Sequence, residues 1–132
     1  MSDEELTEKQ LGLNNKQLNK LKQLHNKKKF PETPFDLGGA VFRFAFALGL
    51  EKGQKIERKN RVNHFHWPQV FKDAGAQEIK TLVEAVSGEN SDDIFKDIEE
   101  YAAWGVEFMH TNGYHEGMEM TVLEEYQKKF DE

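Results

Sequence analysis

The chain has 132 residues, no cysteine and a formal net charge of −6. This length suits one domain, residues 1–132, which we expect to bury about two thirds of the surface of the unfolded chain. Without cysteine, disulfides, thiol nucleophiles and cysteine-ligated zinc are excluded. Residues 1–7 are acidic and contain no apolar run, so we expect no signal peptide and a cytoplasmic location.

Opposite charges gather in the two halves of the chain. Residues 1–66 contain 13 Lys and Arg against 8 Asp and Glu, whereas residues 67–132 contain 5 against 16. This asymmetry suits two subunits that dock plus to minus, or a basic face that touches nucleic acid while an acidic face avoids it. Solvated helix faces give the same composition, so charge alone does not decide among these interpretations.

The N-terminal part is predicted to be a flexible leader over residues 1–13, followed by a helix over residues 15–28. Asn14 or Asn15 is a suitable N-cap, because its side chain can accept a hydrogen bond from a free amide in the first turn. The helix has one apolar face, formed by Leu18, Leu21 and Leu24. Leu11 and Leu13 are suited to hold the end of the leader on the core.

The opposite face of this helix is rich in lysine and has no acidic residue. Such a face gains affinity for phosphates by releasing counterions, so double-stranded DNA is a candidate partner. The candidate DNA-binding residues are these lysines and the basic residues of a later segment: Lys16, Lys20, Lys27, Lys28, Lys29, Arg58, Lys59 and Arg61. A solvated helix face is the alternative, because the lysines have no aromatic residue among them and no arginine-rich helix accompanies them.

The stretch over residues 35–50 is predicted to be the central helix. Between residues 40 and 48 only Arg43 is polar, so apolar side chains cover every side of the helix and protein must surround it. The run is too short for a membrane, because about 20 apolar residues are needed to cross one. Asp36 is the candidate N-cap, and Arg43 is expected to be structural.

Glycines in two predicted helices indicate a close crossing. Gly38 and Gly39 lie in the first turns of the central helix, where glycine disfavours helix formation, so we expect another backbone to approach there. Gly105 lies on the apolar face of a helix that is predicted to begin after an N-cap at Ser91 and to stop at Gly113. We expect Gly105 to permit a tight crossing against the central helix, near Gly38 or Gly39.

The basic segment over residues 55–66 loses the helical period. We predict two extended pieces around a turn, an arrangement that fits a short β-hairpin. His64 and His66 would then share one face of a strand and are weak candidates for metal ligands. The alternative is a pair of surface histidines on either side of a buried Phe65. No cofactor is expected.

Three further helices are predicted in the second half of the chain. They are a short helix that ends at Phe71, a helix over residues 76–87 that ends at Gly88, and a loosely docked helix within residues 114–132. The last of these helices can pack on a partner or on a second copy of the chain. The candidate partner-binding residues are Tyr114, Tyr126 and Phe130.

Together these patterns predict a mainly α fold, a compact helical domain of about five helices around the buried helix at 35–50, with a short β-hairpin at 55–66. No catalytic residue is predicted. The carboxylates after residue 89 follow the outer face of a helix, and although Asp97 and Glu100 could form an acid–base pair, no pattern around any serine or threonine indicates a nucleophile. We therefore expect a protein that is not an enzyme.

Three segments resemble the family of Dnd system-associated protein 4, which is found beside DNA phosphorothioation genes. Val41 to Gln54 resembles the apolar helix of that family and the turn after it, His66 to Phe71 is similar to its Trp-containing element, and Ile94 to Met109 is similar to its Phe-Glu-Glu-Tyr-Ala pattern. The resemblance implies an accessory or adaptor protein of a restriction or antiphage defence system, with other proteins of the locus as partners and no membrane partner. A small DNA-binding module or regulator that uses the basic N-terminal half is the alternative.

Overall fold

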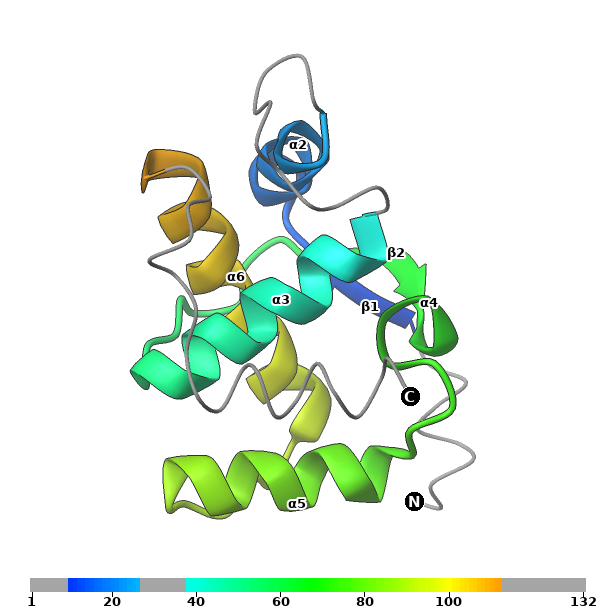
Figure 1. The fold of residues 1–132 in the computed structure, drawn as a ribbon, viewed down its shortest axis with the longest axis vertical. Helices are drawn as coiled ribbons and strands as arrows, with labels where there is room; N and C mark the ends of the chain where they lie inside the picture. Colours follow the sequence, from blue (N-terminus) through cyan, green and yellow to red (C-terminus); the bar gives the residue numbers. More distant parts are fainter. Residues whose placement is uncertain (1–9, 27–37, 113–132) are drawn as a thin grey trace.

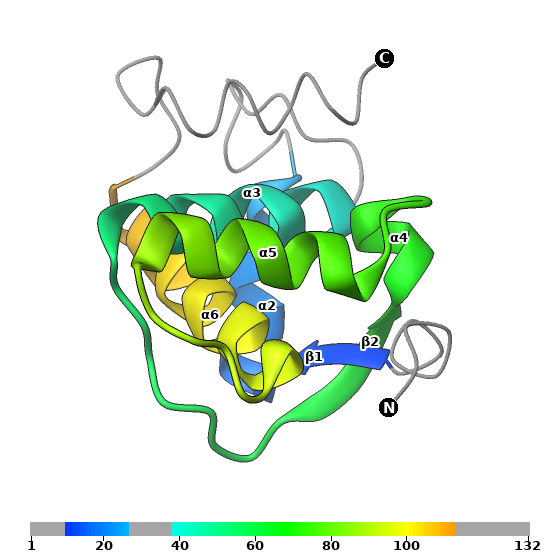
Figure 2. The same cartoon turned by 90° about the horizontal axis from the view of Figure 1, so that it is seen from below.

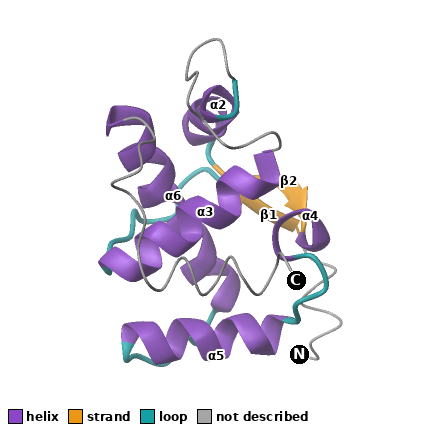
Figure 3. Cartoon of the chain, in the orientation of Figure 1, coloured by secondary structure: helices purple, strands orange, loops and turns teal. Residues whose placement is uncertain are grey.

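The computed structural model describes residues 10–26 and 38–112 (Figure 1). In chain order the elements are β1 (Gln10–Leu13), α2 (Asn15–Leu24), α3 (Gly38–Lys52), β2 (Val62–His66), α4 (Trp67–Phe71), α5 (Ala76–Ser87) and α6 (Ile94–Asn112). The described residues thus form five helices and one two-stranded antiparallel sheet, and the predicted mainly α fold class is confirmed. Figure 3 shows how small the sheet is beside the helices.

Helix α3 is the buried centre of the fold, as predicted. All but one of its residues from Gly39 to Leu50 are buried, and α3 contacts α2, α4, α5 and α6. Figure 2, turned by 90°, shows α3 and α5 side by side with α6 against them. The described part of the helix begins at Gly38, and residues 35–37, where the helix is predicted to start, lie outside the described residues. Its candidate N-cap, Asp36, lies outside the described residues.

Arg43 is the charged residue within the apolar part of this helix, residues 40–50, and its role is structural. Its side chain is buried, and Nη1 donates a hydrogen bond to the carbonyl oxygen of Val70 over 3.1 Å. Val70 lies in the last turn of the short helix α4, where carbonyl groups lack partners within the helix. Arg43 therefore fastens α4 to α3.

The predicted tight helix crossing is present, but its contacts differ from the prediction. A Cβ atom on Gly105 of α6 would overlap the backbone of Ala45, and one on Gly49 of α3 would overlap the backbone of Tyr101. Gly105 therefore does not meet Gly38 or Gly39, because α6 crosses α3 near its middle. Gly39 does allow a close backbone approach, to the carbonyl group of Gln69.

The predicted β-hairpin at 55–66 is wrong. Val62 to His66 do form strand β2, but its partner is β1, so that Leu11 faces Phe65 and Gly12 faces Asn63. This register leaves His64 without a partner in β1, as in a β-bulge. The leader predicted for residues 1–13 is not flexible at residues 10–13, which form strand β1, and Leu11 and Leu13 hold this part of the chain on the core as their apolar side chains indicated.

The helix termini follow the predicted capping residues only in part. Asn14 caps α2, which ends at Leu24 instead of residue 28, and α5 runs from Ala76 to Ser87 as predicted, with Gly88 in the left-handed conformation. Ser91 does not cap α6. Asp93 has that role, since its Oδ1 accepts a hydrogen bond from the amide of Lys96 over 3.1 Å.

The helix predicted within residues 114–132 lies outside the described residues. None of the helices that the structure describes combines the length and the hydropathy that crossing a bilayer requires.

Candidate functional site

Glu99 is the centre of the most extensive polar cluster in the described structure. It lies on α6 with a side chain that is 1% exposed. Its two carboxylate oxygens accept hydrogen bonds from four nitrogen atoms: the amide of Gly12 at 2.6 Å, Nη1 of Arg58 at 2.9 Å, and Nε and Nη2 of Arg61 at 2.9 and 2.7 Å. A buried carboxylate needs such partners, because desolvation of an unpaired charge costs several kcal/mol.

The same cluster covers one edge of strand β1. Arg61 Nη2 also donates to the carbonyl oxygen of Gln10 over 3.2 Å, while the Gly12 amide donates to Glu99. Backbone groups two residues apart point to the same edge of a strand. The Arg61–Glu99 ion pair therefore gives β1 the donor and the acceptor that a neighbouring strand would supply, and an edge that could pair with another chain is closed.

Glu100 fastens the segment that carries the two arginines. Its carboxylate accepts a hydrogen bond from the amide of Arg58 over 2.8 Å, and its carbonyl oxygen accepts one from the amide of Ile56 over 3.1 Å. One helical turn earlier, Asp97 pairs with Lys55 at 3.0 Å. These contacts explain why the segment after α3 runs along α6 instead of pairing with β2.

Part of the charge asymmetry of the chain is used in contacts inside the molecule. Four ion pairs link basic residues of the first half to acidic residues of α6. The pairs are Lys20–Glu107, Lys55–Asp97, Arg58–Glu99 and Arg61–Glu99. These pairs dock part of the basic half of the chain on its own acidic half. Contacts of the remaining charges with a second subunit or with nucleic acid stay predictions.

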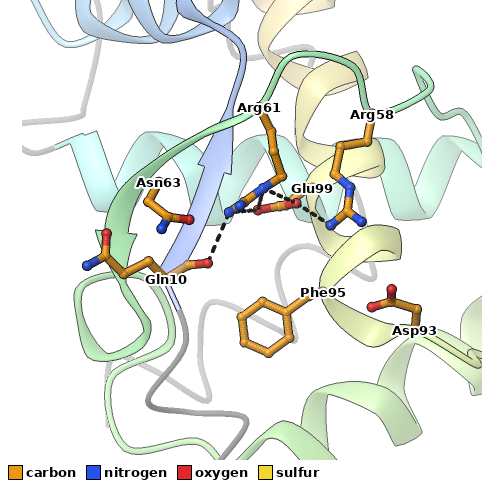
Figure 4. Close-up of a pocket in the computed structure, with 7 residues that line it drawn as sticks. All are labelled: Gln10, Arg58, Arg61, Asn63, Asp93, Phe95 and Glu99. Carbon is orange, nitrogen blue, oxygen red and sulfur yellow. Dashed lines mark hydrogen bonds and ion pairs between the residues drawn. The ribbon is translucent and has the colours of Figure 1, made fainter.

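A surface pocket of about 500 Å³ opens beside this cluster (Figure 4). Figure 4 shows the guanidinium groups of Arg58 and Arg61 around Glu99 along one side, with the ring of Phe95 across from them. Most of the lining is polar, and the lining residues are Gln10, Arg58, Arg61, Asn63, Asp93, Phe95 and Glu99. A pocket of this composition suits a charged or strongly polar group.

The pKa shifts in the described residues follow local contacts. Burial alone would lower the pKa of Lys55, but the hydrogen bond and the negative charge of Asp97 outweigh burial and raise this pKa. Burial raises the pKa of Tyr101, whose ring lies beneath the Lys55 ammonium group. Burial and the nearby charge of Lys22 lower the pKa of His64.

The candidate DNA-binding residues fall into three groups. Lys20, Arg58 and Arg61 are engaged in the ion pairs with α6. Lys16 and Lys59 are exposed and form no ion pair with another described residue. The remaining candidates, Lys27 to Lys29, lie outside the described residues, as do the candidate partner-binding residues Tyr114, Tyr126 and Phe130.

The two candidate metal ligands do not converge with other ligands in the described structure. His64 and His66 are exposed on either side of the buried Phe65, which fits the surface-histidine interpretation. Within residues 10–26 and 38–112, no group of three or more His, Asp and Glu side chains is placed to hold a metal ion.

The carboxylates considered as an acid–base pair have separate roles. Asp97 accepts hydrogen bonds from Lys55 and from the hydroxyl of Ser91, and Glu100 accepts one from the amide of Arg58. Neither residue lines the pocket.

Sequence reasoning missed Glu99, although a signal was present. Phe95 and Ala103 lie four residues before and after it, and side chains at this spacing share one face of a helix. All three are buried. A carboxylate flanked in this way must find cations, and Arg58 and Arg61 were available in the segment before β2.

Comparisons with protein-family models, with curated proteins and with solved structures found no match for this chain. The resemblance described above therefore rests on its three segments alone. In the structure these segments form α3 and the turn after it, α4, and most of α6, so all three contribute to one shared core.

Proposed function

We propose that the protein is a non-enzymatic accessory or adaptor protein that acts in the cytoplasm through contacts with other proteins. The observation that supports this proposal best is the state of Glu99. Its carboxylate is buried and already accepts hydrogen bonds from four nitrogen atoms, an arrangement that favours a fixed structural anion over a group that exchanges protons with a substrate.

The cellular context comes from the resemblance to the family of Dnd system-associated protein 4. On that basis we propose that the partners belong to a DNA phosphorothioation-linked restriction or antiphage defence system. The three segments that carry the resemblance lie in the core, so the resemblance supports a shared fold more directly than a shared binding surface.

A DNA-binding module remains the second candidate, and one observation favours the adaptor over it. Lys20, Arg58 and Arg61 are paired with acidic residues of α6, and the carboxylates that pair with them oppose the approach of a polyanion such as DNA. Of the eight candidate residues, this leaves Lys16 and Lys59 as exposed cations within the described part of the chain. Together with Lys27 to Lys29, which lie outside the described residues, these make five candidates, fewer than the 6 to 10 phosphate contacts that salt-sensitive DNA binding often involves.

Affinity purification from the native locus tests the proposal. A tagged chain expressed at its natural level should recover a protein encoded by a neighbouring defence or DNA-processing gene, and the same two purified proteins should form a complex at 150 mM salt after nuclease treatment. An untagged strain is the control. If no defence or DNA-processing protein is recovered, or if the complex requires DNA, the adaptor proposal is wrong.

A further inference from the structure

The pocket beside Glu99 contains hydrogen-bond donors that the fold does not use. A guanidinium group has five N–H donors in a planar fork. Among the residues that the structure describes, Nε and Nη2 of Arg58 and Nη1 of Arg61 have no hydrogen-bond acceptor. Both side chains remain about one third exposed, at 32% and 29%. Glu99 therefore fixes the two guanidinium groups while leaving part of each fork open to the pocket.

Fixed guanidinium groups are suited to bind a planar anion. Arginine loses less conformational freedom on binding when its side chain is already held, and its fork matches a carboxylate in a bidentate manner. Asn63 and Gln10 also line the pocket, and Figure 4 shows Asn63 beside Arg61, whereas the side-chain amide of Gln10 points away from the arginines. The arrangement favours a ligand that carries a carboxylate group.

The acidic rim of the pocket favours a protein segment of mixed charge over a polyanion such as DNA. Asp93 lines the pocket, and both Asp92 and Asp93 are exposed. These carboxylates repel a polyanion such as the phosphate backbone of DNA. Every phosphate along that backbone is negative, so a phosphate bound by the arginines would bring its neighbours close to Asp93. A cation beside the carboxylate of the ligand would instead pair with Asp93. The pocket is thus complementary to a segment of mixed charge.

The pocket also has the character of a protein contact rather than of a small-molecule site. Small-molecule sites are mostly apolar and enclose most of their ligand, whereas this pocket is open and polar apart from Phe95. Side chains of a docked protein need no such enclosure, because the rest of the partner covers the site.

We infer that the pocket formed by Arg58, Arg61, Asp93 and Phe95 binds an acidic side chain of a partner protein, Asp or Glu, that is adjacent to a basic residue. This inference rests on the proposed adaptor function. The carboxylate of the partner lies against the open fork of Arg58, Nε and Nη2, and against Nη1 of Arg61, and the neighbouring cation lies against Asp93.

The test uses short peptides as probes of the full ¹⁵N-labelled chain in solution NMR. The peptide acetyl-Lys-Glu-Lys-amide should shift the amide signals of Asn63 and Phe95 in a saturable manner, with a dissociation constant on the order of 1 mM, as expected for one or two ion-pair contacts. The matched peptide acetyl-Lys-Gln-Lys-amide should bind at least about tenfold more weakly. Equal shifts with both peptides, or no shift with either, would overturn the inference.

Matched variants assign the shifts to the pocket. Arg58→Gln should weaken binding of the glutamate peptide at least about tenfold. Lys59→Gln removes a positive charge from the next residue and should change the affinity for this peptide by less than about twofold. Asp93→Asn keeps the helix cap and should weaken acetyl-Lys-Glu-Lys-amide but not acetyl-Glu-amide. If Arg58→Gln unfolds the chain, Arg58→Lys serves instead, since it keeps the charge but lacks the fork. Equal effects of the changes at residues 58 and 59 would contradict the inference.

Two further experiments, a titration with duplex DNA and the recovery of a partner from the native locus, distinguish failure of the pocket inference from failure of the adaptor proposal. A 12-base-pair duplex is titrated in the same way. If it shifts the same amide signals more than the glutamate peptide does, the ligand of the pocket is a phosphate backbone and the inference is wrong. If wild type and Arg58→Gln recover the same partner equally from the native locus, the adaptor proposal stands and the pocket inference fails. If the peptide binds through Arg58 but no partner is recovered, the pocket inference stands and the adaptor proposal fails.

Discussion

The amide of Gly12 donates a 2.6 Å hydrogen bond to the carboxylate of Glu99, 87 residues later in the chain. Through this contact the first described strand depends on the last described helix. The two arginines on the same carboxylate tie in the segment before β2, so Glu99 joins three parts of the chain that are distant in sequence.

Removal of Glu99 should therefore destabilise the whole fold. In Glu99→Ala, the Gly12 amide and two guanidinium groups lose their acceptor, and breaking a buried ion pair costs about 3 to 5 kcal/mol. Because both arginines are about one third exposed, water compensates in part and we expect a loss of about 2 to 4 kcal/mol in the free energy of unfolding. Urea denaturation measures it. Glu107→Ala removes a surface partner of Lys20 and should cost less than about 1 kcal/mol. Similar losses in the two variants would contradict a special role for Glu99.

The crossing of α3 and α6 should not tolerate a methyl group. In Gly105→Ala, the new Cβ overlaps the backbone of Ala45, which cannot rotate away as a side chain could. The gain in helix propensity is about 1 kcal/mol, whereas forcing the helices apart costs about 1 to 3 kcal/mol or more, so we expect net destabilisation. Thr111→Ala, at an exposed position of the same helix, should stay within about 0.5 kcal/mol of wild type. Thermal unfolding distinguishes the two. A Gly105→Ala chain as stable as wild type would show that the crossing is looser than described.

Stability should fall above about pH 10. The pKa values of Lys55 and Tyr101 are both raised above their ordinary values of 10.5 and 10.0. Between the unfolded and the folded pKa, the folded chain binds more protons than the unfolded chain, so the free energy of unfolding decreases as the pH rises. The contribution is complete below pH 10 and is lost as the pH passes the folded values. Urea midpoints from pH 8 to pH 11.5 should show this decline, and Tyr101→Phe should make it shallower. An unchanged slope in Tyr101→Phe would exclude Tyr101 as a source.

Binding to duplex DNA offers a direct comparison of the two candidate functions. As an adaptor, the chain should show no measurable affinity for a 24-base-pair duplex at 150 mM salt, and Lys16→Gln and Lys59→Gln should change nothing. For a DNA-binding module, each lysine that contacts phosphate adds about 0.9 to the slope of log affinity against log salt concentration. Fluorescence anisotropy across a salt series measures both quantities. A steep slope that flattens in the lysine variants would favour the DNA-binding module.

Local signals in the sequence predicted the helices well. The uniform apolar surface of residues 40–48 indicated an enclosed helix, and the bounds of α5 follow from its apolar period and from Gly88. Asn14 was recognisable as a cap because capping depends on residues within one turn. These features are decided by neighbours in the sequence.

The sheet and the polar cluster could not be predicted in this way. Residues 55–66 alternate well enough for a hairpin, but β2 pairs with β1, about fifty residues earlier, because Glu99 and Glu100 hold the intervening segment on α6. The pattern of residues along one segment does not show whether its strand pairs with a neighbouring segment or with a distant one such as β1. For the same reason the excess of positive charge suggested an external partner, although α6 was the partner for four of these cations.

The dependence of β1 on Glu99 also has a consequence for synthesis on the ribosome. The 87 residues that separate Gly12 from its acceptor take roughly 4 to 17 s to translate at about 5 to 20 residues per second. Throughout that interval Leu11 and Leu13 belong to a nascent strand with an unsatisfied backbone edge. We therefore expect the first strand to be open to pairing with other chains until α6 has emerged.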